Sequence, residues 1–225
     1  GAVIGFQHIT CVGKADSIIT LKRNKIGFWG GIKYVGTSNT YSPLFKYVDF
    51  NSVGSEGWYT ESQRGAGHER VRFHDCIIQN SEALILTSAY GGNFEVLRCL
   101  FTEDSHFRST LIAGQDGGSV RHNILARNTT GTGGALGLQK GTTLNNFREN
   151  IIFNNKSFYS NCFSGVSPHP FGFNANMNII EILAPNYYGA VDTDYVKKNM
   201  LDYFFQPTYP ILIGSDSAMA TPPSQ

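Results

Sequence analysis

The sequence predicts an all-β chain, folded as a right-handed parallel β-helix of about six to seven coils with a C-terminal capping segment. Three observations predict this fold: a short segment that recurs along the chain, a second apolar stretch in each repeat, and a composition suited to tight turns. The 225 residues include 25 glycines and many Asn, Ser and Thr residues. Gly and Asn tolerate the positive φ angles of turns. Few runs of Ala, Glu, Lys and Leu are present to favour helices instead.

The recurring segment is four residues long and ends in an anchor residue that is Asn, Cys or Phe. The six copies are Leu21-Lys-Arg-Asn24, Tyr47-Val-Asp-Phe50, Phe73-His-Asp-Cys76, Val96-Leu-Arg-Cys99, Val120-Arg-His-Asn123 and Phe147-Arg-Glu-Asn150. Their anchors follow one another at spacings of 26, 26, 23, 24 and 27 residues, and a weaker seventh copy ends at Asn178. A fixed period of this size indicates a solenoid whose repeats stack on one another.

Apolar and polar residues alternate around each anchor. The first residue of every copy is apolar, and the residue just before the anchor is polar or charged. Two residues after the anchor, five copies of six are apolar, with Ser52 as the exception; the five are Ile26, Ile78, Phe101, Leu125 and Ile152. Such alternation is typical of a strand with one buried face. Equivalent positions of stacked parallel strands lie about 4.8 Å apart, so we expect an amide ladder between Asn123 and Asn150.

Each repeat contains a second apolar stretch about 8–14 residues after the anchor, separated from the first by Gly, Ser and Asn. The stretches are Ile32 to Val35, Trp58-Tyr59, Leu84 to Leu86, Leu111 to Ala113, Leu136 to Leu138, and Cys162-Phe163. Two or three short strands per coil are therefore expected over residues 1–184. Residues 185–225 are expected to form a cap and a Pro/Ser tail, with one short helix from Asp192 to Phe205.

The composition excludes several classes of protein. A net charge of +1 with 16% charged residues predicts no nucleic-acid partner, because nucleic acids require a concentrated basic surface. No run of 18 apolar residues occurs, so no direct membrane insertion is expected. The four cysteines show no CxxC spacing and predict neither a disulfide scaffold nor a metal site. Cys76 and Cys99 fall in one column and are expected to be stacked, buried free thiols.

Two motifs carry a family resemblance. Gly133-Gly-Ala-Leu136 followed by Phe147-Arg-Glu-Asn150 is similar to the paired GGA(I/L/V) and FxxN motifs of polymorphic outer-membrane-protein and adhesin-type β-helix repeats. The segment from Tyr209 to Ala218 resembles an ending common in bacterial surface proteins of the pectate-lyase-like superfamily, except that Asp216 and Ser217 stand where Ser-Pro is expected. The resemblance implies an extracellular or cell-surface protein. Its members include polysaccharide lyases, pectin hydrolases, phage tailspikes, adhesins and structural proteins, so the fold leaves function open.

Charged residues next to the anchors are the candidates for chemistry. If the chain is an enzyme, the candidate catalytic residues are Asp75, Arg98, His122 and Glu149. Lyases of the superfamily use a Lys or Arg base beside a uronate, and its hydrolases use paired carboxylates. The candidate carbohydrate-binding residues are Arg98, Arg121, Arg148, Trp58 and Tyr59. The alternative is a solvated face on which opposite charges pair across rungs.

The signatures of known active sites are missing from the chain. The Asn-Thr-Asp, Asp-Asp and Gly-His-Gly set of the pectin hydrolases and the aspartate triad of the calcium-dependent lyases do not occur. Glu103 and Asp104 are adjacent but are expected in a loop or cap. No cofactor and no metal site is predicted; calcium is the one ion that the resemblance would admit.

We therefore expect a non-catalytic surface, adhesive or filament-forming protein. Its expected partners are a glycan, other surface proteins or further copies of itself in an oligomer or filament. The alternative function is a glycan-active β-helix, either a polysaccharide lyase or hydrolase or a module like a phage tailspike. A groove that holds the four candidate catalytic residues together would favour the enzyme. A flat ladder of paired charges would favour the structural protein.

Overall fold

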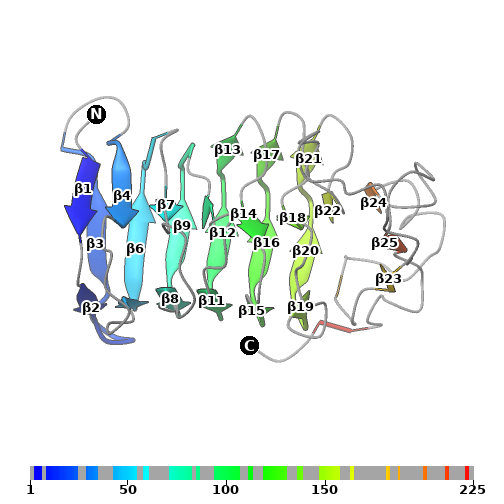
Figure 1. Ribbon diagram of the computed structural model, residues 1–225, viewed down its shortest axis with the longest axis horizontal. Helices are drawn as coiled ribbons and strands as arrows, with labels where there is room; N and C mark the ends of the chain where they lie inside the picture. Colours follow the sequence, from blue (N-terminus) through cyan, green and yellow to red (C-terminus); the bar gives the residue numbers. More distant parts are fainter. Residues whose placement is uncertain are drawn as a thin grey trace, which may run out of the picture.

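Figure 1 shows the computed structural model of the chain, in which short strands lie side by side along the long axis. The structure describes residues 3–6, 9–24, 29–34, 43–54, 58–60, 71–82, 85–86, 94–106, 111–113, 119–130, 136–138, 147–157, 163–164, 181–182, 187, 200–201, 211–212 and 221–222. These residues form strands, bridges and turns and include no helix, as an all-β chain requires. Within them, no helix is long and apolar enough to cross a lipid bilayer.

Most strands belong to three parallel sheets, called here sheets I, II and III. Sheet I contains β2 (Thr10–Val12), β5 (Leu44–Lys46), β8 (Val71–His74), β11 (Phe94–Leu97), β15 (Ser119–Arg121) and β19 (Phe147–Arg148). Sheet II contains β3 (Ile19–Lys22), β6 (Val48–Asn51), β9 (Ile77–Gln79), β12 (Leu100–Thr102), β16 (Ile124–Ala126) and β20 (Ile151–Phe153). Sheet III contains β1 (Val3–Phe6), β4 (Gly31–Tyr34), β7 (Trp58–Thr60), β10 (Ile85–Leu86), β14 (Leu111–Ala113), β18 (Leu136–Leu138), β22 (Phe163–Ser164) and β24 (Met200–Leu201).

Two smaller sheets complete the described strands. Sheet IV contains β13 (Ser105–His106), β17 (Thr129–Thr130) and β21 (Lys156–Ser157), each of which follows a strand of sheet II. The last sheet pairs β23 (Glu181–Ile182) with β25 (Ile211–Leu212).

The chain visits sheets I, II and III in the same order again and again, so the neighbours of each strand come from the repeats before and after it. In sheet I, for example, His74 pairs with Leu97 and Leu97 pairs with Arg121, in parallel register. The predicted repeat of stacked parallel strands is thereby confirmed for the four repeats anchored at Cys76, Cys99, Asn123 and Asn150.

The first two anchors were predicted wrongly. Asp49 pairs with Ile77, so Val48 and not Phe50 occupies the position of Cys76. Ile19 pairs with Val48, so Asn24 lies five residues beyond the anchor position and is exposed. A shift by two keeps the same strand face inward, since Val48 and Phe50 are both fully buried. The corrected register also removes the Ser52 exception, because Phe50 pairs with Ile78 in the apolar column. The seventh anchor, Asn178, lies outside the described residues.

Most of the described core consists of the inward residues of sheets I and II, and Ile32 of β4 adds a buried residue from sheet III. Phe45 and Phe73 stack at a centroid distance of 5.3 Å, and Phe50 packs edge-on against Phe45 at 5.6 Å. Toward the later repeats, other apolar side chains continue the two columns and remain fully buried or nearly so; they are Ile78, Val96, Phe101, Val120, Leu125 and Ile152. Each large apolar side chain removed from water stabilises the stack by about 1.5–3 kcal/mol.

The chain turns sharply at two corners, and each turn places a residue other than glycine at positive φ. The first corner column lies between sheets I and II and has φ of 53–59° at Tyr47, Asp75, Arg98, His122 and Glu149. The second corner column follows sheet II and has φ of 51–61° at Ser52, Asn80, Glu103, Arg127 and Asn154. This left-handed conformation costs about 1–2 kcal/mol per residue. Backbone hydrogen bonds between repeats continue through the corners and offset that cost, for example from the Asp75 N–H to the Leu97 carbonyl at 3.0 Å.

The residue after each first-corner residue points inward, and in two repeats this residue is asparagine. Asn123 Nδ2 donates to Asn150 Oδ1 at 3.0 Å, which confirms the predicted amide ladder. Asn123 Oδ1 accepts the backbone N–H of Cys99 at 2.8 Å, and Asn123 Nδ2 also donates to the Val96 carbonyl at 2.9 Å. Both asparagines are completely buried, so the ladder satisfies backbone groups that the turn would otherwise leave unpaired.

Strand pairing continues into the C-terminal part of the chain. Tyr187 forms a parallel bridge with Ile151, and β24 pairs with β22 in sheet III. The helix expected from Asp192 to Phe205 is contradicted at Met200–Leu201, which form β24; the other residues of that range lie outside the described part. Sheet pairing with β22 outweighs the helical pattern there. The boundary at residue 184 between the stack and a cap remains a prediction.

Candidate functional site

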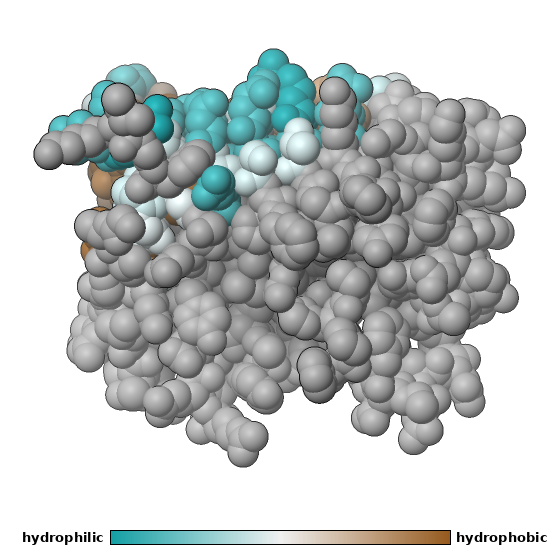
Figure 2. Space-filling model, turned by 90° about the horizontal axis from the view of Figure 1, so that it is seen from above, coloured by the Kyte–Doolittle hydropathy of each residue, from teal (hydrophilic) through white to brown (hydrophobic). Residues whose placement is uncertain are grey.

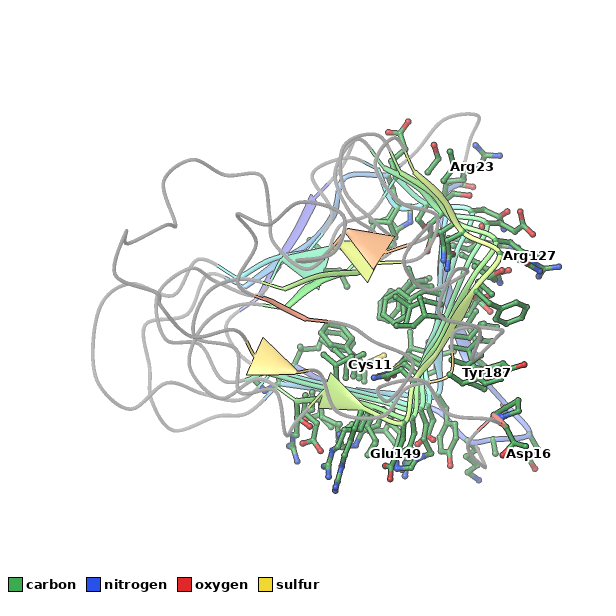
Figure 3. All side chains as sticks on the ribbon, turned by 90° about the vertical axis from the view of Figure 1, so that its right-hand side faces the viewer. Cys11, Asp16, Arg23, Arg127, Glu149 and Tyr187 are labelled. Atoms are coloured by element: carbon green, nitrogen blue, oxygen red, sulfur yellow. The ribbon has the colours of Figure 1, made fainter. Side chains whose placement is uncertain are left out.

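Four of the five first-corner residues are the candidate catalytic residues Asp75, Arg98, His122 and Glu149, which stand one repeat apart. In the view along the stack, Glu149 projects outward at one corner and Arg127 projects outward at the other (Figure 3). Strained backbone often marks a functional site. Here the same strain recurs in the second corner column with different side chains, so the conformation is a property of the fold.

The strongest contact in the first corner column joins Asp75 and Arg98. Arg98 Nε lies 2.6 Å from Asp75 Oδ1, and Arg98 Nη2 donates to Asp75 Oδ2 at 3.0 Å. Lys46 Nζ approaches the same carboxylate at 4.0 Å. The hydrogen bonds to Asp75 raise the pKa of Arg98 above its already high value. A guanidinium held in this way is a poor proton acceptor, which disfavours its use as a lyase base.

The next two residues of the column form a second pair. His122 Nε2 lies 2.9 Å from Glu149 Oε2, and Arg148 Nε lies 3.8 Å from the same oxygen. Both side chains of the His122–Glu149 pair are about one third exposed. The four candidate residues of the column therefore form two acid–base pairs between neighbouring repeats, which is the arrangement expected of a solvated charge ladder. The second corner column has a similar pair, with Arg127 Nε 3.0 Å from Glu103 Oε1.

The predicted carbohydrate-binding residues are divided between sheets. Arg121 and Arg148 pair in neighbouring strands of sheet I, and Arg98 lies in the first corner column. Trp58 and Tyr59 lie in β7 of sheet III. The side chains of these two aromatic residues are outside the described part of the structure, so a sugar-stacking platform stays a prediction. Each arginine lies within 4 Å of a carboxylate: Asp75, Glu95 and Glu149, respectively, for Arg98, Arg121 and Arg148.

A half-buried polar cluster on sheet I centres on Glu95, a residue that the sequence reasoning missed. Glu95 lies 3.6 Å from His74 Nε2 and 3.7 Å from Arg121 Nη2. Burial lowers the pKa of His74, and the neighbouring Glu95 only partly opposes that shift. The sequence does contain a signal for Glu95, which is the alternation in β11: Glu95 stands between Phe94 and Val96 and must face outward.

A second polar ladder was also missed. Five residues after each correctly assigned anchor stand Ser81, Asp104, Asn128 and Asn155, and all four are buried. Asn128 Nδ2 donates to Asn155 Oδ1 at 2.9 Å, and the Asp104 N–H donates to Asn128 Oδ1 at 3.1 Å. Glu103 and Asp104 lie outside the strands, in the turn between β12 and β13, as expected, but the Asp104 side chain faces the interior with 1% exposure. The constant offset of five residues was the signal available in the sequence.

Cys76 and Cys99 are stacked, buried and free, as predicted. The Cys76 thiol lies 3.2 Å from the His74 carbonyl, and the Cys99 thiol lies 3.3 Å from the Phe73 carbonyl. Burial raises the pKa of the Cys99 thiol well above its usual value, and the neighbouring Cys76 adds to the effect. These thiols are structural, because a reactive cysteine needs an exposed thiolate.

Within the described ranges, no three His, Cys, Asp or Glu side chains are grouped as a metal site.

From the side on which β13, β17 and β21 lie, hydrophilic residues form a band along the long axis (Figure 2).

The chain matches no protein-family model, no curated protein and no solved structure. Its function must therefore be argued from its own residues.

Proposed function

We propose that the chain is a right-handed parallel β-helix of the pectate-lyase-like superfamily that serves as a non-catalytic extracellular surface protein. It would act as an adhesive or filament-forming rod. The observation that carries the proposal is the paired first corner column. There, Arg98 is held by Asp75 and His122 is held by Glu149, across neighbouring repeats. A lyase or hydrolase needs a base or a carboxyl group that is free to act on substrate.

The repetitive architecture supports the same proposal. Sheets I, II and III follow one another in a constant order, as successive coils of a β-helix would. Each motif of the family resemblance contributes a residue that begins a strand, since Leu136 begins β18 and Phe147 begins β19. A stack of this kind is quasi-one-dimensional, and its long sides suit binding to extended or repeating partners.

Sheet II offers a surface for such contacts. Its outward column contains the partly exposed aliphatic residues Ile77, Leu100 and Ile124, which pair in register in neighbouring repeats. A column of aliphatic side chains along a flat parallel sheet favours lateral association, because association removes that surface from water. Further copies of the chain, other surface proteins and neutral glycans are the partners that this surface would accept.

The proposal is tested by measuring assembly and binding. Sedimentation velocity over a range of concentrations and negative-stain electron microscopy should show rods that associate side by side. Replacing Ile77, Leu100 and Ile124 by Thr should reduce the association, because Thr has the β-branched shape favoured in strands and presents less apolar surface. The matched control is Arg127→Gln in the second corner column. A protein that stays monomeric at every concentration and binds nothing on a glycan array would contradict the proposal.

A further inference from the structure

Asp104 is the one acidic residue in the second polar ladder. Its Oδ1 accepts the backbone N–H of Ser81 at 2.9 Å, and its own N–H donates to Asn128 Oδ1 at 3.1 Å. These are the same bonds that an asparagine makes at this position, since Asn155 Oδ1 accepts the Asn128 N–H at 2.9 Å. Asp104 therefore occupies an asparagine site.

The second carboxyl oxygen, Oδ2, occupies the place that Nδ2 takes in the other rungs. Asn128 Nδ2 donates to the Phe101 carbonyl at 3.1 Å and to Asn155 Oδ1 at 2.9 Å. Asn155 Nδ2 likewise donates to the Leu125 carbonyl at 2.8 Å. Phe101 pairs with Ile78, so the same geometry directs Asp104 Oδ2 toward the Ile78 carbonyl and Asn128 Oδ1. Both of these groups are hydrogen-bond acceptors.

An ionised carboxylate cannot satisfy this site. Asp104 Oδ2 is buried, and among the described residues no donor lies within hydrogen-bonding distance of it. Two oxygen acceptors facing a buried anion would repel it, and a buried charge without a partner is costly. One proton on Oδ2 removes the charge and converts the carboxyl group into a hydrogen-bond donor for one of these acceptors.

We propose that Asp104 is a neutral carboxylic acid in the folded protein, and that the proton on its Oδ2 supplies the missing hydrogen bond of the second polar ladder. The O–H donates to the Ile78 carbonyl or to Asn128 Oδ1. The hydrogen bonding of Asp104 in the second polar ladder then depends on pH. It is complete in acid and weakens when the proton leaves.

The charges around Asp104 are consistent with this state. Burial raises the pKa of Asp104 well above its usual value, the Ser81 N–H opposes the shift, and the neighbouring Glu103 adds to it. Glu103 is exposed and paired with Arg127, whose Nε lies 3.0 Å from it. From the repeat before, Ser81 faces Asp104 as a neutral group, with Glu82 next to it in the chain. From the repeat after, the neutral Asn128 faces it.

The direction of the pH effect follows from proton linkage. The folded state keeps a proton that the unfolded chain releases near the ordinary aspartate value of 3.8. The stability that depends on this proton is fully present below that pH. It decreases as the pH rises through the window between 3.8 and the raised folded pKa, and it is lost above the window.

Infrared spectroscopy of the full chain tests the protonation state directly. With ¹³C-labelled aspartate, the wild-type protein at pH 7 should show the C=O band of a protonated carboxyl group, and Asp104→Asn should lack this band. The exposed neighbour serves as the control, because Glu103→Gln should leave the band in place. Absence of a protonated aspartate band from the wild-type protein at pH 7 would overturn the proposal, and this result does not depend on how stable any variant is.

Thermal unfolding tests whether Asp104 makes the stability of the stack depend on pH. Because the amide of Asp104→Asn can donate to both acceptors at every pH, this variant should unfold at a Tm at least about 4 °C higher than wild type at pH 8. The difference in Tm should shrink as the pH falls toward 4. Asn128→Asp should add a second pH dependence of the same sign. A difference between wild type and Asp104→Asn that is constant from pH 4 to pH 8 would contradict the proposal.

Discussion

Removing the Asn123 side chain is the sharpest test of the stacked architecture. The side chain makes three hydrogen bonds: it accepts from the Cys99 N–H at 2.8 Å and donates to the Val96 carbonyl at 2.9 Å and to Asn150 Oδ1 at 3.0 Å. In Asn123→Ala, the Cys99 N–H and one lone pair of the Val96 carbonyl lose their partner in the buried interior of the stack. Each buried group left unpaired costs about 1–3 kcal/mol.

The two groups together give an expected loss of unfolding free energy of about 2–6 kcal/mol, and the Asn123 N–H adds nothing to it because it keeps its bond to Asn150 Oδ1. For a chain of this size, that loss lowers Tm by roughly 4–24 °C. Differential scanning calorimetry and urea unfolding followed by circular dichroism measure the two quantities. Hydrogen exchange of the Cys99 amide should accelerate in the same variant.

The matched control is Asn24→Ala. A repeat alignment made from the sequence alone puts Asn24 in the same column as Asn123, whereas the structure leaves Asn24 exposed and five residues away from that column. Asn24→Ala should change the unfolding free energy by less than about 0.5 kcal/mol. If Asn123→Ala were no more destabilising than Asn24→Ala, the register and the ladder would both be refuted.

Three further predictions concern other parts of the stack. Gly13→Ala should lower Tm in a calorimetric scan, because a Cβ at this position would lie 2.6 Å from the main-chain oxygen of Tyr47; an unchanged Tm would contradict the close approach. A double-mutant cycle on Asp75 and Arg98 in urea unfolding should give a coupling of only about 0.5–1 kcal/mol, because the Arg98 side chain is 41% exposed and solvent screens the pair; a coupling above about 2 kcal/mol would indicate a buried functional pair. Cys99 should resist alkylation in the native protein and react after denaturation, as peptide mapping by mass spectrometry can show; rapid native labelling would contradict its burial.

The fold was largely predictable because two signals in the sequence agree: the recurrence of the four-residue segment and the alternation of apolar and polar residues around it. Alternation identified the inward residues of the later repeats, and the anchors from Cys76 to Asn150 were placed in the correct register. The first repeats failed because alternation has a period of two, so a shift from Val48 to Phe50 preserves the buried face and leaves no error visible. Asn24 shares only its residue type with Asn123 and Asn150, and the type of a residue does not reveal whether its side chain is buried.

The candidate site was predictable in position but not in pairing. The sequence shows that Asp75, Arg98, His122 and Glu149 share an outward column. Which neighbours form pairs depends on the direction that each side chain takes from an αL residue, and the spacing of residues does not encode that direction. The burial of Asp104 was missed for a related reason: the sequence places it beside Glu103 in a turn, and only the second corner directs one of the two residues inward.

The central claim is that the paired column is a surface and not an active site. The most direct measurement incubates the purified protein with a panel of acidic and neutral polysaccharides, with and without calcium, and follows reducing ends and unsaturated products. Our account predicts no cleavage of any polysaccharide. Cleavage that disappears in Arg98→Ala or Glu149→Ala would contradict it and would place an active site on the first corner column.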